Sequence, residues 1–188
     1  MVYPVLLHGN KVVLREFRIE DGEGAWRIVG DDQVTRTLSF DSRDKATAQA
    51  MIDGAVERAK LDPRTEYYLA ISHTEADELI GFVRLALGGV QAAKLGYALR
   101  ADEWGHGYAT DAVTIMMTFA FEMLHLHRVT AAIGPDNEAS IRLVERLGFT
   151  REGVLREHVF TNGSWRDSIL YSALGRLPRP EPLSTLSA

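Results

Sequence analysis

The sequence predicts an α/β (α+β) fold in which a mixed, mostly antiparallel sheet of seven strands is flanked by about four helices. Segments with strand-like and helix-like patterns alternate along most of the chain. Three strand-like runs near the middle are joined by links short enough for hairpin turns, which indicates antiparallel pairing. The chain has 188 residues, of which 46% are hydrophobic, so one domain with a sizeable core is expected.

The first half of the chain holds a strand, two helices and a meander of three strands. Residues 11–17 form a β-rich run, and residues 19–32 are typical of a short helix opened by acidic residues. Within residues 41–60, apolar side chains recur at spacings of three and four and share one helical face: Ala48, Met51, Ile52, Ala55, Val56 and Ala59. The strands of the meander are expected at residues 66–72, 79–87 and 93–100.

The second half alternates helix and strand before a final hairpin. A long apolar helix is expected at residues 108–126, followed by a strand at residues 128–133. Asn137 and Gly148 are a capping residue and a terminal glycine, so a helix is predicted between them. The last two strands, which flank the turn sequence TNGS, are expected at residues 151–160 and 167–174.

Composition narrows the possible functions. The chain has 26 acidic residues against 21 lysines and arginines, a formal net charge of -5, and no run of like charge that could follow a phosphate backbone, so nucleic acid is not expected as a partner. It has no cysteine, which excludes disulfides, thiolate nucleophiles and Cys-ligated zinc. His125 and His127 are two residues apart at a predicted helix end, a spacing that does not present two imidazoles to one ion. No metal site is therefore expected.

The ends of the chain carry weak signals. The opening residues lack a secretory pattern, and no segment reaches the roughly 18 uncharged apolar residues of a membrane span, so no membrane partner and a cytoplasmic location are expected. Residues 1–175 are predicted to be one domain. Residues 176–188 are Pro-rich without apolar periodicity and are predicted to be a disordered tail.

Residues 104–112, WGHGYATDA, place two glycines between a predicted strand and a predicted helix. Gly105 and Gly107 allow positive φ and carry no side chain, so successive N–H groups can point into one concavity at the positive end of the helix dipole. That geometry favours a phosphate group. A glycine pair can equally form only a tight connection, so the two glycines alone leave both interpretations open.

Two nucleotide-binding motifs do not fit this loop. A dinucleotide-binding loop would need a third glycine where Thr110 stands, and the strand before it would belong to a parallel sheet rather than end a hairpin meander. A Walker P-loop would need Gly-Lys-Ser/Thr after the glycines, and that sequence is absent.

Over about residues 9–175 the sequence resembles the GCN5-related N-acetyltransferases (the GNAT family), and most closely the branch typified by the ribosomal-protein alanine acetyltransferases. That family has a loop Arg/Gln-x-x-Gly-x-Gly/Ala after its fourth strand, which grips the pyrophosphate of acetyl-CoA. The stretch NEASIRLVERLGFTREG resembles the branch's Asn-x-x-Ser and Leu-Gly-Phe-x-x-Glu-Gly motifs, and NGSWRDSILYSAL resembles its C-terminal strands. The resemblance implies that the loop binds acetyl-CoA through Trp104, Gly105, His106, Gly107, Tyr108, Ala109 and Thr110.

The resemblance also implies a GNAT fold in which the fourth and fifth strands begin as neighbours and then splay apart. The pantetheine arm of the coenzyme fills the gap and pairs with free backbone groups of the fourth strand, here expected at Leu99, Arg100 and Ala101. An N–H group there would bond the thioester oxygen as negative charge develops. Asn137 and Arg142 are expected to contact the coenzyme as well, and Asn137 could also simply cap its helix.

Proton transfer is where this chain departs from the family's commonest pattern. Many members protonate the departing thiolate with a tyrosine seven residues after the Asn, and that position is Val144 here. The ribosomal-protein branch uses a serine three residues after the Asn, which is Ser140, one helical turn before Val144. A serine hydroxyl is a poor free acid, so Ser140 is expected to work as a hydrogen-bonded relay, the alternative being a second helix cap.

The general base is left open. Branch members often carry a Glu just before Gly-Tyr on the fourth strand, but Lys94 stands there in this chain. Glu103 is the first candidate to take the proton of the amine and Glu66 the second, and each could instead be only a solvated charge.

Three function classes follow. The leading one is an enzyme that moves an acetyl group from acetyl-CoA to a primary amine, either a protein N-terminus or a small molecule, without a metal or a covalent intermediate. The others are a non-catalytic acyl-CoA-binding sensor and a structural module whose glycine loop is only a turn. Succinyl-CoA is an alternative donor, and a homodimer is possible. Acceptor choice is expected to depend on residues 31–45 and on the last hairpin.

Overall fold

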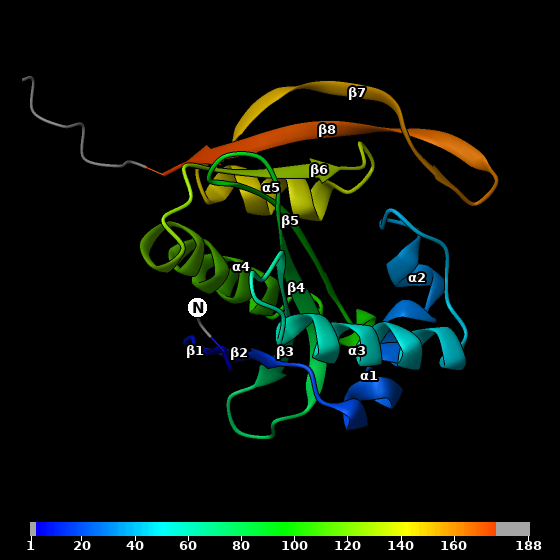
Figure 1. Ribbon diagram of the computed structural model, residues 1–188. Helices are drawn as coiled ribbons and strands as arrows, with labels where there is room; N and C mark the ends of the chain where they lie inside the picture. Colours follow the sequence, from blue (N-terminus) through cyan, green and yellow to red (C-terminus); the bar gives the residue numbers. More distant parts are fainter. Residues whose placement is uncertain (1–2, 176–188) are drawn as a thin grey trace, which may run out of the picture.

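The structure is a computed structural model that describes residues 3–175 (Figure 1). Within these residues, eight strands form one sheet in the order β1-β2-β3-β4-β5-β6-β8-β7. The strands are β1 (Leu6–His8), β2 (Val12–Glu16), β3 (Glu66–His73), β4 (Leu79–Leu87), β5 (Ala92–Leu99), β6 (Arg128–Ile133), β7 (Thr150–Thr161) and β8 (Ser164–Leu174). The α-helices of this part of the chain are α1 (Gly22–Val29), α2 (Asp32–Thr35), α3 (Lys45–Ala59), α4 (Tyr108–Thr118) and α5 (Glu138–Arg146), and short 3-10 helices lie at Ile19–Asp21 and Ala101–Glu103. The predicted α/β fold with a mixed, mostly antiparallel sheet is confirmed.

Helices cover both faces of the sheet. On one face α4 and α5 contribute Met116 and Val144 to the larger core cluster. On the other face α1, α2 and α3 build a second cluster that includes Ile52. Strand β3 serves both clusters, because successive side chains on a strand point to opposite faces: Leu69 lies in the larger cluster and Ala70 in the second.

The meander predicted for the middle of the chain is confirmed. β3, β4 and β5 are antiparallel neighbours, with Tyr67 opposite Leu85 and Phe82 opposite Ala98. Strand β5 then passes through a short loop into α4, so the two glycines lie between a strand and a helix as expected.

The predicted splay of two neighbouring strands is also confirmed. β5 and β6 run parallel but pair only from Ala92 opposite Arg128 to Lys94 opposite Thr130. Beyond Lys94 the strand β5 continues for five residues, to Leu99, without pairing to β6. A wedge therefore opens between the second half of β5 and the second half of β6, next to the loop that leads to α4.

Three details differ from the prediction. The sheet has eight strands rather than seven, because β1 is a three-residue edge strand with no continuous apolar pattern. The four-residue helix α2 is too short to show a helical period. The helix predicted for residues 108–126 ends as an α-helix at Thr118 and continues as a π-helical turn over Phe119–Met123. Each feature is shorter than the window in which a periodic pattern becomes visible.

Two predictions concern the ends of the chain and its environment. The proposed tail, residues 176–188, lies outside the described residues, so it remains a prediction. None of the helices between residues 3 and 175 is long and apolar enough to cross a membrane.

Candidate active site

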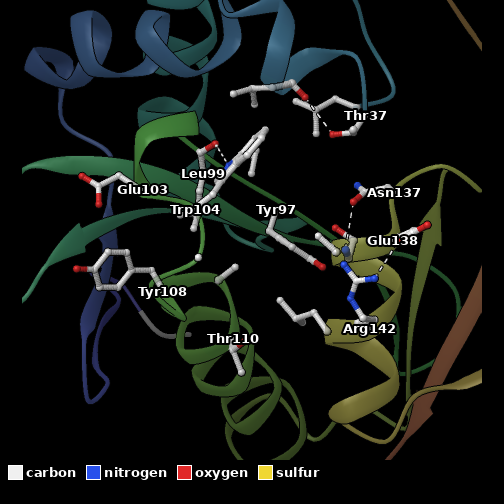
Figure 2. Close-up of a pocket in the computed structure, with 18 of the residues that line it drawn as sticks. Thr37, Tyr97, Leu99, Glu103, Trp104, Tyr108, Thr110, Asn137, Glu138 and Arg142 are labelled. Carbon is white, nitrogen blue, oxygen red and sulfur yellow. Dashed lines mark hydrogen bonds and ion pairs between the residues drawn. The ribbon is translucent and has the colours of Figure 1, made fainter.

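A cleft of about 560 Å³ opens at the wedge between the splayed strands (Figure 2). Its walls come from the segment after α2, the end of β5, the loop before α4 and the first turns of α5. Of the predicted site residues, those that line the cleft are Leu99, Glu103, Trp104, Gly105, Gly107, Tyr108, Ala109, Thr110, Asn137, Ser140 and Arg142. The structure thus brings together most of the residues that the motifs singled out.

The glycine loop has the backbone conformation that its sequence requires. Gly105 and Gly107 both have φ of +83°, in the left-handed region that side chains disfavour. Gly107 is the N-cap residue of α4, so the unpaired N–H groups of the first turn of that helix lie next to the loop. This arrangement combines exposed N–H groups with the positive end of a helix dipole, which is the geometry that binds phosphate.

Lys11 and Val12, at the start of β2, form hydrogen bonds with this loop and with the first turn of α4. The Asp111 carboxylate, in the first turn of α4, accepts hydrogen bonds from the backbone N–H groups of Lys11 at 2.8 Å and Val12 at 3.1 Å. The Lys11 ammonium group donates to the carbonyl oxygen of His106 at 2.8 Å. A Cβ atom at Gly107 would lie 3.2 Å from the Lys11 Nζ atom, so a positive charge stands beside the loop. Sequence reasoning missed Lys11, because only the fold brings it next to a loop 95 residues away.

Of the other two loop residues, the Trp104 side chain lines the cleft and the His106 side chain does not. Trp104 packs into the cleft wall and donates from its indole Nε1 to the carbonyl oxygen of Leu99 at 3.1 Å. The His106 ring does not line the cleft but stacks on Tyr108, with ring centroids 5.5 Å apart. Any contact of His106 with a ligand of the cleft would therefore run through its backbone.

The free edge of β5 requires a correction to the predicted backbone contacts. The Arg100 N–H donates to the carbonyl oxygen of Ile80 at 2.8 Å, so it faces β4. Because the backbone groups of successive strand residues point to opposite edges, Leu95, Tyr97 and Leu99 present theirs to the wedge. Leu99 is thus well placed, whereas Arg100 and Ala101 line a neighbouring hollow. The sequence located the strand end but not which alternate residues face the gap.

The first turn of α5 forms the wall opposite β5. The Asn137 side-chain oxygen accepts the Ser140 N–H at 3.1 Å, so Asn137 caps the helix as its sequence position suggested. The Arg142 guanidinium is exposed and pairs with Glu138 at 2.8 Å. Val144 is fully buried in the core, so the position at which many family members carry a tyrosine holds no proton donor.

The first candidate base, Glu103, is held in an ion pair. Its carboxylate lies 3.0 Å from the Arg100 guanidinium and 3.3 Å from the His73 Nε2 atom. Figure 2 shows this carboxylate on the far side of Trp104 from Asn137. Both features weigh against direct proton transfer from an amine in the cleft, so the role of Glu103 stays a prediction.

The second candidate base, Glu66, does not line the cleft. Although burial of this carboxyl opposes ionisation, hydrogen bonds from Arg58 and Arg84 outweigh it and lower the pKa of Glu66. Such a carboxylate is a weak proton acceptor. Lys94, which replaces the glutamate common in the branch, is exposed on β5.

The remaining wall of the cleft comes from the segment after α2, and the last hairpin fixes it. Arg36, Thr37 and Leu38 line the cleft. The Arg166 guanidinium on β8 donates to the carbonyl oxygens of Arg36 and Leu38, both at 2.5 Å. This contact joins the two segments on which acceptor choice was expected to depend, residues 31–45 and the last hairpin.

The family model of the acetyltransferase (GNAT) domain matches residues 11–150. The Bacillus subtilis (strain 168) protein named "Probable N-acetyltransferase YjcK" is 39% identical over 168 residues, which cover 86% of this chain and 93% of that protein. The ribosomal protein uS5-alanine N-acetyltransferase of Escherichia coli (strain K12) is 31% identical over 107 residues, 55% of each chain.

Among solved structures, Mycobacterium smegmatis RimJ in complex with CoA-disulfide superposes with a TM-score of 0.81 at 23% sequence identity, covering 94% of this chain and 91% of that one. At this identity the likeness shows the shared fold. The family model and the 39% identical relative show the family as well as the fold, because each match spans most of the chain. The chain therefore belongs to the GNAT acetyltransferase family and is an N-acetyltransferase.

Proposed function

We propose that this N-acetyltransferase moves the acetyl group of acetyl-CoA to a primary amine by direct attack of the amine on the thioester carbonyl. One observation carries the proposal: the positive-φ glycine loop and the unpaired edge of β5 open into the same cleft. The loop suits a pyrophosphate, and the edge suits an amide-containing arm that pairs like a strand. Acetyl-CoA carries both groups joined to each other, because its pantetheine arm runs from the pyrophosphate to the thioester.

The donor would lie along the cleft with its pyrophosphate on the N–H groups around Gly105 and Gly107 and its pantetheine arm beside β5. The thioester would then reach the end of β5, where the Leu99 N–H can stabilise the negative charge that develops on the carbonyl oxygen. Asn137 and Arg142 would flank the arm from α5. A thioester brings its own leaving group, so the reaction needs alignment and proton transfer rather than a metal.

Two protons must move. The amine loses one and the departing thiolate gains one, and Ser140 on the cleft wall is the proposed relay to the sulfur. The ion pair that holds Glu103 favours a water molecule as the immediate acceptor of the amine proton, with Glu103 behind it.

The acceptor enters from the side of Arg36, Thr37 and Leu38. The similarity to the uS5-alanine acetyltransferase supports a protein N-terminus as acceptor, and a small-molecule amine is the alternative. Arg36 in this wall could pair with the carboxylate of a succinyl group, which keeps succinyl-CoA as a second donor. A cytoplasmic location and a homodimer remain predictions, the latter testable by sedimentation.

A non-catalytic acyl-CoA sensor is the second candidate. The acid and the base that most members of the family carry are missing from this cleft. Val144 stands at the position of the usual tyrosine acid, and Lys94 stands at the position of the branch's glutamate. Glu103, the first candidate base, is held in an ion pair. A sensor would bind CoA with the same loop and strand edge but release no thiol.

Thiol release from acetyl-CoA and succinyl-CoA, measured with a panel of amines, separates these functions. The panel should hold peptides with different N-terminal residues, amino acids and polyamines, with products identified by mass spectrometry. We expect thiol release and an acetylated product with at least one amine. Binding of CoA without release on any amine would establish the sensor, and absence of CoA binding would leave the loop a structural turn.

A further inference from the structure

Tyr97 lies on the free half of β5, directly in the cleft. Its side chain shares a strand face with Leu95 and Leu99, which belong to the core beneath α4 and α5. Figure 2 shows the ring between Trp104 and the start of α5, with the hydroxyl group directed toward the helix. Tyr97 therefore spans the wedge from the strand to the wall that carries Ser140.

The Tyr97 hydroxyl is buried, and among the described residues it has no hydrogen-bond partner. Two buried tyrosines outside the cleft have partners: the Tyr171 hydroxyl donates to Glu145 at 2.9 Å, and the Tyr68 hydroxyl donates to the sulfur of Met51 at 3.5 Å. A buried hydroxyl without a partner destabilises the fold and marks a place where a ligand can supply one. Of the described side chains with such an atom, Tyr97 is the one that lines the cleft.

Ser140 is the polar neighbour of this phenol. Burial raises the pKa of the Tyr97 phenol above its ordinary value, and the nearby Ser140 hydroxyl offsets part of that rise. Both side chains line the cleft, and no hydrogen bond of standard geometry joins the two hydroxyls. Tyr97 is therefore protonated at neutral pH, and a small adjustment of the cleft when the donor binds would join the two groups.

We propose that Tyr97 is the proton source behind Ser140 for the departing thiolate of CoA. As the carbon–sulfur bond breaks, the Ser140 proton passes to the sulfur while the Tyr97 proton passes to the Ser140 oxygen. The serine is restored, the thiol is complete, and the phenolate recovers a proton from water. This inference rests on the proposed function, to which it adds the group that a serine relay lacks.

A phenol suits this role better than the serine alone. Even with its pKa raised by burial above the ordinary tyrosine value of about 10, the Tyr97 phenol is a stronger acid than an isolated serine hydroxyl. A phenol that donates to Ser140 also polarises the serine hydroxyl, which then donates more strongly to a thiolate. Tyr97 therefore acts through Ser140: it orients the serine hydroxyl and replaces the proton that the serine gives up.

The test uses CoA itself as the probe, so it does not depend on knowing the acceptor. The pKa of the thiol of bound CoA is measured from thiolate absorbance for the parent protein, Tyr97→Phe, Ser140→Ala and the double variant. The charged side chains that line the cleft are the same in all four proteins: Arg36, Glu103, Asp136, Glu138, Arg142 and Arg146. Differences between the proteins therefore report on the two hydroxyls.

We expect Ser140→Ala and Tyr97→Phe each to leave about tenfold less thiolate at a given pH, because each weakens a hydrogen bond to a charged sulfur. In the Ser140→Ala background, Tyr97→Phe should have no further effect, since the relay is already broken. Ser140→Thr, which keeps the hydroxyl, should titrate like the parent. Tyr68→Phe removes a buried tyrosine hydroxyl outside the cleft and should also leave the titration unchanged.

An unchanged titration in Tyr97→Phe would overturn the proposal, and so would a full additional effect of Tyr97→Phe in the Ser140→Ala background. The same four proteins, assayed for turnover with an active amine, should show the same pattern in kcat with little change in the KM for acetyl-CoA. If no amine is acetylated although CoA binds, the proposed function fails while the titration still decides the role of Tyr97.

Discussion

The two halves of the cleft are built in opposite ways. The half proposed to hold the donor comes from two short stretches, the end of β5 with the glycine loop and the start of α5. The half proposed to hold the acceptor is the segment around Arg36 and Leu38, fixed by Arg166 about 130 residues later. Local motifs thus determine the shape of the donor half, whereas a long-range contact determines the shape of the acceptor half. Substitutions should therefore affect donor binding and acceptor binding separately.

The hairpin that carries Arg166 is itself well defined. Asn162 and Gly163 join β7 to β8 with φ of +51° and +71°, which is the conformation of a two-residue type I′ turn. The Asn162 N–H donates to the Asp41 carboxylate at 2.8 Å, a second contact between the hairpin and the segment after α2. The acceptor wall therefore depends on the hairpin at two points.

The largest effect is expected in the donor half, at Gly107. Gly107→Val should weaken CoA binding by about a hundredfold or more, because a β-branched residue resists a φ of +83° and its side chain would occupy phosphate space. Calorimetric titration with CoA measures the change. Gly89→Val places the same strain in the β4–β5 turn, where φ is +76°, and should leave CoA affinity unchanged. Equal losses in both variants would remove the phosphate interpretation of the loop.

The next effect concerns the chemistry between the halves. Ser140→Ala should lower kcat by about a hundredfold, since a positioned proton donor contributes at least that much, while the KM for acetyl-CoA changes little. Steady-state kinetics with the best amine measures both constants. A Ser140 that only supported the helix would instead lower the melting temperature and leave turnover per folded molecule at the parent rate.

A smaller effect is expected in the acceptor half. Arg166→Ala should raise the KM for the amine by about tenfold, because the segment around Arg36 and Leu38 loses two charge-assisted hydrogen bonds. Its affinity for CoA should stay at the parent value. Arg156→Ala removes the same charge from an exposed position on β7 and serves as the control. If Arg166→Ala weakened CoA and amine alike, the two halves would not be separable.

The smallest effect is expected where β2 supports the loop. Asp111→Ala removes the acceptor of two backbone hydrogen bonds and should lower the free energy of unfolding by about 1–2 kcal/mol, measured by urea denaturation. Asp111→Asn keeps a side-chain oxygen and should lose less. CoA affinity should fall far less than in Gly107→Val; a comparable loss would mean that Asp111 shapes the phosphate site itself.

The sequence predicted the donor half because its signals are local. Two glycines before a helix and an Asn that caps the next helix can be recognised without knowing how the strands pair. The alternation at the end of β5 could not be predicted, because the bond between Arg100 and Ile80 decides which groups face the wedge. The positions of Lys11 and Arg166 depend on contacts across 95 and 130 residues, for which a single sequence carries no signal. The short elements β1 and α2 lack a readable period.

The most direct test of the account is to map bound CoA on the protein by NMR. At 20.9 kDa the chain suits amide chemical-shift mapping with isotope-labelled protein. If CoA lies along the glycine loop and β5, its binding should cause large shifts for the amides of Gly105, Gly107 and Leu99 and for the first turn of α5. Shifts in the hairpin around Asn162 should be small. Large shifts confined to the hairpin or to the face that carries α3, with Gly105 and Gly107 unmoved, would contradict this placement of CoA.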